Sequence, residues 1–398
     1  MNFITRKTLL WIGVFCLFLP SLLQAYLLMP FPFSQDFEAI SLAYFLQKII
    51  FPLRIIGLLS VSYPTFYYFT KGTNKQKIIV SIIILLAGIT YYFTDISYKA
   101  EVMFEEPKSI KFLTKEENKL PDSLIVLSVL NNGIAKAFPI NFVGYHHKIQ
   151  DEIGNLPALV TYCTMCRTGV VFSPIVNGKK QTFRLVGARH YNAVLEDAET
   201  KSWWYQATGQ AVVGKLKGQQ LVVIPSEQMT LKTFLQQYPK GLILQADENY
   251  KKEYADLKNY DRRQRKDEDS LKNPNKFWDK SWIIGITINQ KNKAYSWAKL
   301  LNISILQDNF AKVPLLLVIE KDKHSFHVFD RKIDNKILDF ELDSAQNKLR
   351  DKISKSLWNW QGECVEGELK GQKLRKIPAQ QEYWRAWKEF HQPTEIWH

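Results

Sequence analysis

Two cysteines, Cys163 and Cys166, are the residues of this sequence best suited to chemistry, because only two residues separate them. Two thiolates at this spacing can share one soft metal ion, and neutral imidazoles can complete a tetrahedral shell around it. The same pair could instead close a simple disulfide in an oxidising compartment, or act as a dithiol redox centre. Thioredoxin-type centres place the pair at a helix N-terminus, whereas the segment that follows here, 168–172, is predicted to be a strand.

Three histidines in the same part of the chain could supply the remaining ligands of a metal site. We expect Cys163 and Cys166 to bind the ion together with His190 and with His146 or His147. Copper(I) suits two thiolates, and zinc suits the same ligand set equally well. The cofactor expected from the sequence is therefore a copper or zinc ion.

The elements that must position these residues belong to an internal repeat. Residues 201–209 (Lys-Ser-Trp-Trp-Tyr-Gln-Ala-Thr-Gly) resemble residues 355–362 (Lys-Ser-Leu-Trp-Asn-Trp-Gln-Gly). Each stretch is followed by Gly-x-Leu-Lys-Gly-Gln and then by Ile-Pro. We therefore predict two tandem copies of one unit, at 123–244 and 281–397.

The candidate ligands are absent from the second copy. Glu320 and Lys323 stand at the positions of the two cysteines, and Ile303 and Ser304 stand at those of the adjacent histidines. No histidine falls near the counterpart of His190. The pattern indicates that the cysteines and histidines belong to one site, with the second copy as a structural partner.

Short β-like runs dominate each copy, which predicts a β-rich α+β fold. Strands are expected at 123–130, 157–162, 169–172, 181–186 and 219–224. Asn177-Gly178 has the composition of a tight hairpin turn. Helical patterns are confined to segments such as 229–238 and 381–390.

An apolar N-terminal region precedes these copies and predicts a membrane anchor of about three transmembrane helices, at 9–29, 49–69 and 78–93. Arg6 and Lys7 precede the first helix, and three lysines lie between the second and third. By the positive-inside rule these groups face the cytoplasm, so the soluble region lies on the extracytoplasmic side of a bacterial cell membrane. A signal peptide cleaved near Ala25 is the alternative for the first segment.

The expected domain boundaries follow from these patterns. The transmembrane anchor takes 1–98, the first repeat with the Cys-x-x-Cys pair 99–244, a charged linker 245–280 and the second, degenerate repeat 281–398. The net charge of +14 is spread among acidic neighbours and comes without a nucleic-acid-binding motif, so nucleic acid is not an expected partner.

The motif string resembles a bacterial family known as domain of unknown function 3179. The resemblance rests on the following segments: 146–151, 161–169, 183–192, 202–204 and 209–218. It covers 123–244 well and the second copy more weakly. The resemblance implies that the Cys-x-x-Cys pair is the hallmark of the family, and it implies no particular activity.

Together these patterns predict an integral membrane protein with an extracytoplasmic Cys/His site for copper or zinc, and they leave open whether it is an enzyme. A thiol–disulfide redox protein that uses Cys163 and Cys166 is one alternative. A non-catalytic interaction module with an aromatic surface around Trp203 and Trp204 is the other. The sequence specifies neither a protein partner nor a small-molecule substrate.

Overall fold

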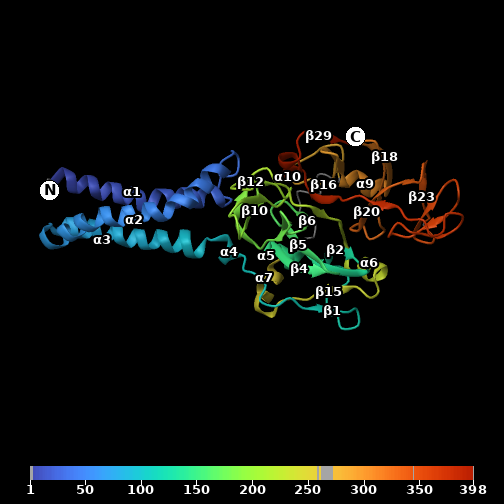
Figure 1. Ribbon diagram of the computed structural model, residues 1–398, viewed down its shortest axis with the longest axis horizontal. Coiled ribbons are helices and arrows are strands. Elements are labelled where there is room, and N and C mark those ends of the chain that lie inside the picture. Colours follow the sequence, from blue (N-terminus) through green and yellow to red (C-terminus); the bar gives the residue numbers. More distant parts are fainter. Residues whose placement is uncertain (1–2, 258–259, 261–271, 344, 398) are drawn as a thin grey trace. The chain divides into compact units, whose positions relative to one another are not determined.

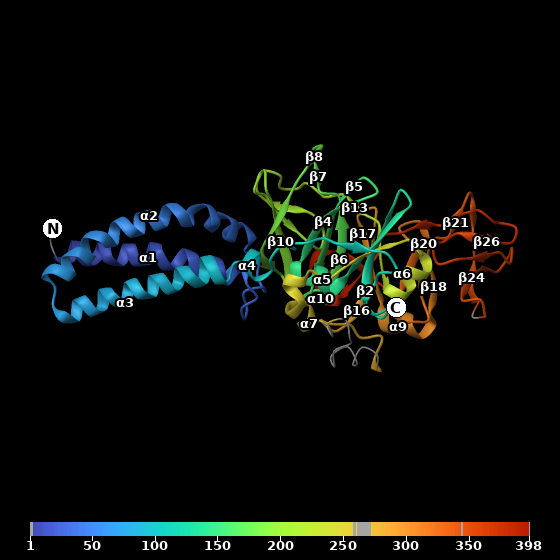
Figure 2. The ribbon, with the colours of Figure 1, turned by 90° about the horizontal axis from the view of Figure 1, so that it is seen from below.

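The computed structural model describes residues 3–257, 260, 272–343 and 345–397. The chain begins with three long helices, α1 (Phe3–Leu28), α2 (Ile40–Lys71) and α3 (Asn74–Tyr91), and α3 continues as the π-helical turn η1 (Tyr92–Ser97). All three are long and apolar enough to cross a membrane. The three apolar helices expected from the sequence are therefore present, and Figure 2 shows them running alongside one another.

Small residues allow α1 and α2 to approach closely, as is common between helices in membranes. A Cβ atom added to Gly13 would lie 2.3 Å from a methyl carbon of Val61 and 2.8 Å from the carbonyl oxygen of Gly57. Near the other end of the helices, Arg54 forms an ion pair with Asp95 and donates a hydrogen bond to Ser21. Arg54 is thus held within the helical bundle.

The chain divides into two compact units. The helical unit comprises Met1–Glu105, Thr182–Tyr205 and Gln210–Gln220, and the sheet unit comprises Glu106–Gln181, Gln206–Gly209 and Leu221–His398. These units do not coincide with the expected domains, because part of the predicted first repeat folds with the helices.

A four-stranded antiparallel sheet completes the helical unit. Its strands are β9 (Phe183–Arg189), β10 (Asn192–Asp197), β11 (Trp203–Tyr205) and β12 (Ala211–Val213), in the order β12-β11-β10-β9. Trp203 and Trp204 are buried, and their indole N–H groups donate to Glu196 and Asp197 at 2.9 and 3.0 Å. The ring of Tyr44 on α2 packs edge-on against Trp203. The two tryptophans therefore belong to a core and form no exposed aromatic surface.

Two sheets form the first part of the sheet unit. One has the order β1-β15-β3-β2-β14 and the other has the order β13-β6-β5-β4. The strand bounds are β1 (Phe112–Leu113), β2 (Ile125–Asn131), β3 (Ile134–Pro139), β4 (Lys148–Ile153), β5 (Leu156–Cys163), β6 (Thr168–Phe172), β13 (Val223–Ile224), β14 (Ser226–Thr230) and β15 (Leu242–Leu244). Helices α5 (Ile140–His146) and α6 (Leu231–Gln237) connect strands, and the hairpin of β7 (Ile175–Val176) and β8 (Lys179–Lys180) turns at Asn177-Gly178 as expected.

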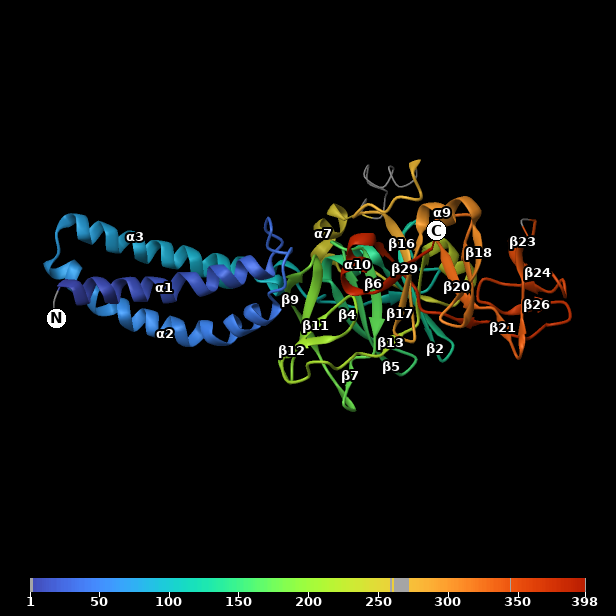
Figure 3. The same cartoon turned by 90° about the horizontal axis from the view of Figure 1, so that it is seen from above.

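The second part of the sheet unit contains three four-stranded sheets, in the orders β28-β16-β17-β29, β18-β19-β20-β27 and β23-β24-β25-β26. Their bounds are β16 (Trp282–Ile288), β17 (Lys291–Ser296), β18 (Ile305–Phe310), β19 (Val313–Ile319), β20 (Phe326–Asp330), β23 (Phe340–Asp343), β24 (Lys348–Asp351), β25 (Leu357–Trp358), β26 (Cys364–Glu366), β27 (Arg375–Lys376), β28 (Gln380–Tyr383) and β29 (Thr394–Ile396). A short hairpin of β21 (Lys332–Ile333) and β22 (Lys336–Ile337) and the helices α9 (Trp297–Ile303) and α10 (Trp384–Phe390) complete it. Figure 3 shows the β23–β26 sheet beyond β18 and β20. The β-rich soluble region predicted from the sequence is confirmed.

Several boundaries differ from expectation for identifiable reasons. The helix expected at 229–238 begins only at Leu231, because the Thr230 side chain caps it by accepting from the amide of Thr233. The segment expected to be a solvated linker begins with η2 (Glu248–Tyr250) and α7 (Lys251–Asp256), whose Tyr250 and Tyr254 are buried in the core beneath α5. The start of that segment is therefore packed, and its basic run at 262–266 lies outside the described residues.

Candidate functional site

Cys163 is the last residue of a strand, and Cys166 lies within the tight turn that follows it. Strand β5 ends at Cys163, β6 begins at Thr168, and these two residues are opposite each other in the antiparallel ladder. The thiol of Cys166 points back toward the carbonyl oxygen of Cys163 at 3.7 Å. Both cysteines are buried, with exposed fractions of 0% and 1%, and no disulfide joins these two described residues.

Close packing requires a small residue at position 169, the second residue of β6. A Cβ atom added to Gly169 would lie 2.9 Å from a methyl carbon of Leu127 and 3.0 Å from the ring of Tyr162. At the turn itself Arg167 adopts a left-handed backbone conformation, with φ of 61°. The glycine therefore lets β6 pack closely against β2, and this packing fixes where the cysteine turn can lie.

The second half of the chain supplies the other wall of the site through β28. The amide of Tyr383 donates to the carbonyl oxygen of Cys166 at 3.0 Å. The hydroxyl of Thr168 donates to the carboxyl group of Glu382, and Arg167 donates to the side-chain oxygen of Gln381 at 3.1 Å. We call this group of residues, Cys163, Cys166, Arg167, Thr168, Gln381 and Glu382, the thiol junction.

The thiol junction contains buried polar atoms that lack partners. The guanidinium of Arg167 lies 3.7 Å from the ring centre of Trp282, yet its Nε and Nη1 make no hydrogen bond with any described residue. The same holds for Oε1 of Glu382. Burial raises the pKa of the Glu382 carboxyl group well above its usual value, and a negative charge on Cys166 raises it further. Unsatisfied buried groups are costly, and such groups gather at functional sites more often than in ordinary cores.

The two adjacent histidines of the expected metal site have structural contacts. His146 is buried, and its Nε2 lies 2.6 Å from the hydroxyl of Tyr254. His147 is also buried, and its Nδ1 lies 3.2 Å from the carbonyl oxygen of Tyr145. Burial lowers the pKa of His147 to about 4, so this ring is neutral near pH 7.

His190 belongs to the helical unit, whereas the cysteines belong to the sheet unit. Its Nδ1 lies 3.0 Å from the carbonyl oxygen of Gln35, and its Nε2 lies 3.0 Å from the carboxylate of Glu38. The hydrogen bond from His190 lowers the pKa of Glu38. This histidine thus anchors the loop between α1 and α2.

Among the residues that the structure describes, no three His, Cys, Asp or Glu side chains are grouped so that they could hold a metal ion. Copper or zinc binding by Cys163, Cys166, His190 and His146 or His147 stays a prediction.

Sequence patterns missed Glu382 and Gln381, which complete the thiol junction. A signal was present in the expected repeat, because the alignment of Ile224-Pro225 with Ile377-Pro378 places Glu382 opposite Met229. Met229 is completely buried in β14, so the register alone puts an acidic residue at a core position.

The fold and the site define a class of protein: a β-rich domain with a buried Cys-x-x-Cys turn, preceded by helices able to cross a membrane. The chain belongs to the family described as Protein of unknown function (DUF3179), whose family model matches residues 105–394. The match spans both halves of the sheet unit and begins after the helices, so the resemblance extends well into the second half. No curated protein and no solved structure matches this chain.

Proposed function

We propose that this protein is a membrane-anchored dithiol protein in which Cys163 and Cys166 exchange with a substrate disulfide. In this reaction the two thiols are oxidised to a disulfide, and the two sulfurs of the substrate leave as thiols that carry the two protons. The observation that carries the proposal is the position of Cys163 at the end of β5 and of Cys166 in the turn that follows, with the Cys166 thiol pointing back toward the carbonyl oxygen of Cys163.

The surroundings of the turn support dithiol chemistry. Arg167 supplies a buried positive charge in the same turn, which favours a thiolate. Glu382 supplies a carboxyl group beside Cys166 that can hold a proton during exchange. Because both sulfurs are buried, the dithiol is shielded from bulk oxidants, and exchange depends on opening of the β5–β6 turn.

An extracytoplasmic location of the soluble region is part of this proposal. Arg6 lies near the start of α1, and Lys71, Lys75 and Lys77 flank the turn between α2 and α3, so these basic residues share one end of the three helices. Basic residues favour the cytoplasmic side. Reporter fusions after Lys75 and after Lys108 should then report opposite sides of the membrane, and a cytoplasmic signal after Lys108 would overturn this location.

We also propose that residues 123–244 and 281–397 are copies of one unit. In its support, β2 to β15 and β16 to β29 follow one another in the same order, with β15 parallel to β3 and β29 parallel to β17. The isolated bridges Gln210–Gln220 and Glu363–Lys373 occur at matching places. Superposition of the two segments in an experimental structure tests the idea, and it fails if Trp204 and Trp358 occupy unrelated positions.

Redox titration of the full chain in detergent tests the dithiol. After equilibration in glutathione buffers, thiol labelling should reveal one two-electron transition, and Cys163→Ser or Cys166→Ser should abolish it. Cys364→Ser is the matched control, because that cysteine is also buried but lies in the second half. Labelling that does not respond to the buffer, or stoichiometric copper or zinc that is lost in Cys163→Ser, would refute the proposal.

A further inference from the structure

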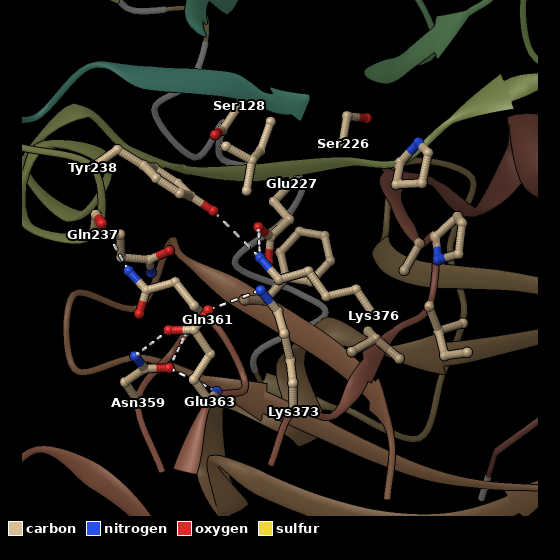
Figure 4. Close-up of a pocket in the computed structure, with 17 residues that line it drawn as sticks. Ser128, Ser226, Glu227, Gln237, Tyr238, Asn359, Gln361, Glu363, Lys373 and Lys376 are labelled. Carbon is tan, nitrogen blue, oxygen red and sulfur yellow. Dashed lines mark hydrogen bonds and ion pairs between the residues drawn. The ribbon is translucent and has the colours of Figure 1, made fainter. Parts of the chain in front are cut away.

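The sheet unit contains a cavity of about 420 Å³ that the proposed dithiol chemistry does not use. Residues from β2, β14, β20 and β27, from the end of α6 and from the loops on either side of β26 line it (Figure 4). This volume is within the range of pockets that hold small organic ligands. Its apolar lining is formed mainly by Leu130, Pro225, Phe326, Val328, Ile377 and Pro378.

Two lysine side chains from the same stretch of chain reach into this cavity. Figure 4 shows Lys373 and Lys376 pointing toward its central region. Lys373 pairs with Glu363 at 2.8 Å, while Lys376 pairs with Glu227 and lies 3.4 Å from the hydroxyl of Tyr238. An ammonium group has three N–H donors, so both lysines keep at least one donor for a further acceptor.

The carboxylate of Glu227 is already neutralised by two partners, of which Lys376 lines the cavity and His327 does not. Its Oε1 lies 2.8 Å from Nδ1 of His327, and Nε2 of the same ring lies 2.7 Å from Glu320. Burial alone would lower the pKa of His327, but the hydrogen bonds to the two carboxylates outweigh burial and raise it to about 9. The imidazolium and Lys376 both face Glu227, which therefore has little remaining negative charge to repel an anion.

Two polar atoms that line the cavity have no partner among the described residues. The hydroxyl of Ser128 is one, and its side chain is only 2% exposed. The side-chain oxygen of Gln237 is the other, and its amide nitrogen already donates to Glu320 at 3.2 Å. Buried polar atoms are normally hydrogen-bonded, so a bound molecule with an O–H or N–H group would satisfy them.

The cavity charges are not required by the scaffold. The bridge Glu363–Lys373 corresponds to Gln210–Gln220, and the register of the repeated motif places Val223 at the position of Lys376. The same backbone arrangement thus forms with neutral residues elsewhere in this chain.

We propose that this cavity binds a small organic carboxylate. The carboxylate accepts hydrogen bonds from Lys373 and Lys376, the carbon skeleton lies on the apolar wall, and a donor group on the ligand reaches Gln237. The apolar wall offers contacts to a carbon skeleton, which inorganic phosphate lacks. The combination of two lysines with an apolar wall therefore favours an organic carboxylate over inorganic phosphate.

A matched pair of ligands tests this site on the full chain in detergent. Calorimetric titration with 4-phenylbutyrate should give saturable binding, whereas 4-phenylbutyramide, which has the same skeleton without the charge, should bind at least about tenfold more weakly. Inorganic phosphate should not compete.

The variant Lys373→Gln introduces the residue found at the matching bridge and should weaken binding of the acid by about tenfold. It should fold, because the Lys373–Glu363 pair is about half exposed. Lys370→Gln, at an exposed lysine outside the cavity, is the control and should not change the affinity. Equal binding of acid and amide, competition by phosphate, or unchanged affinity in Lys373→Gln would overturn the proposal.

Discussion

Among the described residues, two of the places where the halves of the sheet unit contact each other differ in their chemistry. At the thiol junction, β28 of the second half lies against β6 of the first, next to Cys166. At the second place, β14 of the first half lies against β20 of the second, and the amide of Thr230 donates to Ser325 at 3.0 Å. We call the charged residues there, Glu227, Glu320, His327 and Lys376, the histidine junction.

The two junctions differ in how completely their charged groups are paired. In the histidine junction one imidazole lies between two carboxylates, and Lys376 pairs with one of them. In the thiol junction Arg167 and Glu382 keep buried atoms without hydrogen-bond partners among the described residues. A polar cluster that is fully paired rigidifies a fold, whereas an incompletely paired one is maintained at a cost in stability. Similar strand contacts can therefore carry a fully paired set of charges at one junction and an incompletely paired set at the other.

Of the expected effects, the loss of stability on removal of the His327 imidazole should be the largest. His327→Leu leaves Glu227 and Glu320 without their shared partner in a buried place, so the free energy of unfolding should fall by about 3–5 kcal/mol. Glu382→Gln in the thiol junction should change it by less than about 1.5 kcal/mol, because no charge pair is broken. Urea titration of the full chain in detergent, followed by tryptophan fluorescence, measures both, and equal losses in the two variants would contradict the comparison.

The pH dependence of the free energy of unfolding also tests the difference between the two junctions, and the expected change is somewhat smaller. The pKa of His327 rises from an ordinary 6.5 to about 9. Its contribution to the free energy of unfolding is therefore complete below pH 6.5 and is lost as the pH rises through 9. Burial alone would raise the pKa of Glu227, but Lys376 and His327 lower it to about 2, so its contribution is complete above about pH 4.5 and is lost toward pH 2.

At alkaline pH the loss of the His327 contribution should lower the free energy of unfolding by at most about 3 kcal/mol. Unfolding titrations of the full chain at pH 7 and pH 10 measure it. His327→Gln should remove most of this difference, and a wild-type protein equally stable at both pH values would show that the imidazole is not held in its charged form.

The smallest expected effect concerns the redox behaviour of the thiol junction. Disulfide formation removes any negative charge on Cys166, which lowers the pKa of Glu382 relative to the reduced protein. Protons therefore favour the reduced form, and between the two pKa values the midpoint potential should fall by an extra 30 mV or so per pH unit. Glu382→Gln should remove this extra slope, while Glu366→Gln, at an exposed acid of the second half, should keep it. An unchanged slope in Glu382→Gln would show that protonation of this carboxyl group is not coupled to oxidation of the cysteines.

Local patterns predicted the local parts of the structure. Hydropathy indicated three long apolar helices, period-two runs indicated the strands, and Asn177-Gly178 indicated its hairpin turn. The strands expected at 157–162 and 169–172 agree with the positions of β5 and β6. These features depend on residues close together in the chain, where side-chain type and backbone preference act directly.

Contacts between distant segments were not predictable in the same way. Thr168 and Glu382 are 214 positions apart, and no periodicity says which strand of the second half packs against the cysteine turn. His190 was expected to bind a metal, but its ring holds a loop 155 positions earlier in the chain. An imidazole suits both tasks, and only the folded arrangement decides between them.

The helical unit is built from three separate segments of the chain, which has a practical consequence for any attempt to express the soluble part without the helices. The guanidinium of Arg189, on β9, is completely buried and donates to the carbonyl oxygens of Leu27 and Ser34 at 2.9 and 2.6 Å. A truncation near residue 97 would remove these acceptors together with the ring of Tyr44 that covers Trp203. In such a fragment the guanidinium of Arg189 would lack these hydrogen-bond acceptors, and the ring of Trp203 would be exposed. We therefore expect the fragment to aggregate. The helices of this protein are part of a folded body, and purification should keep them in place.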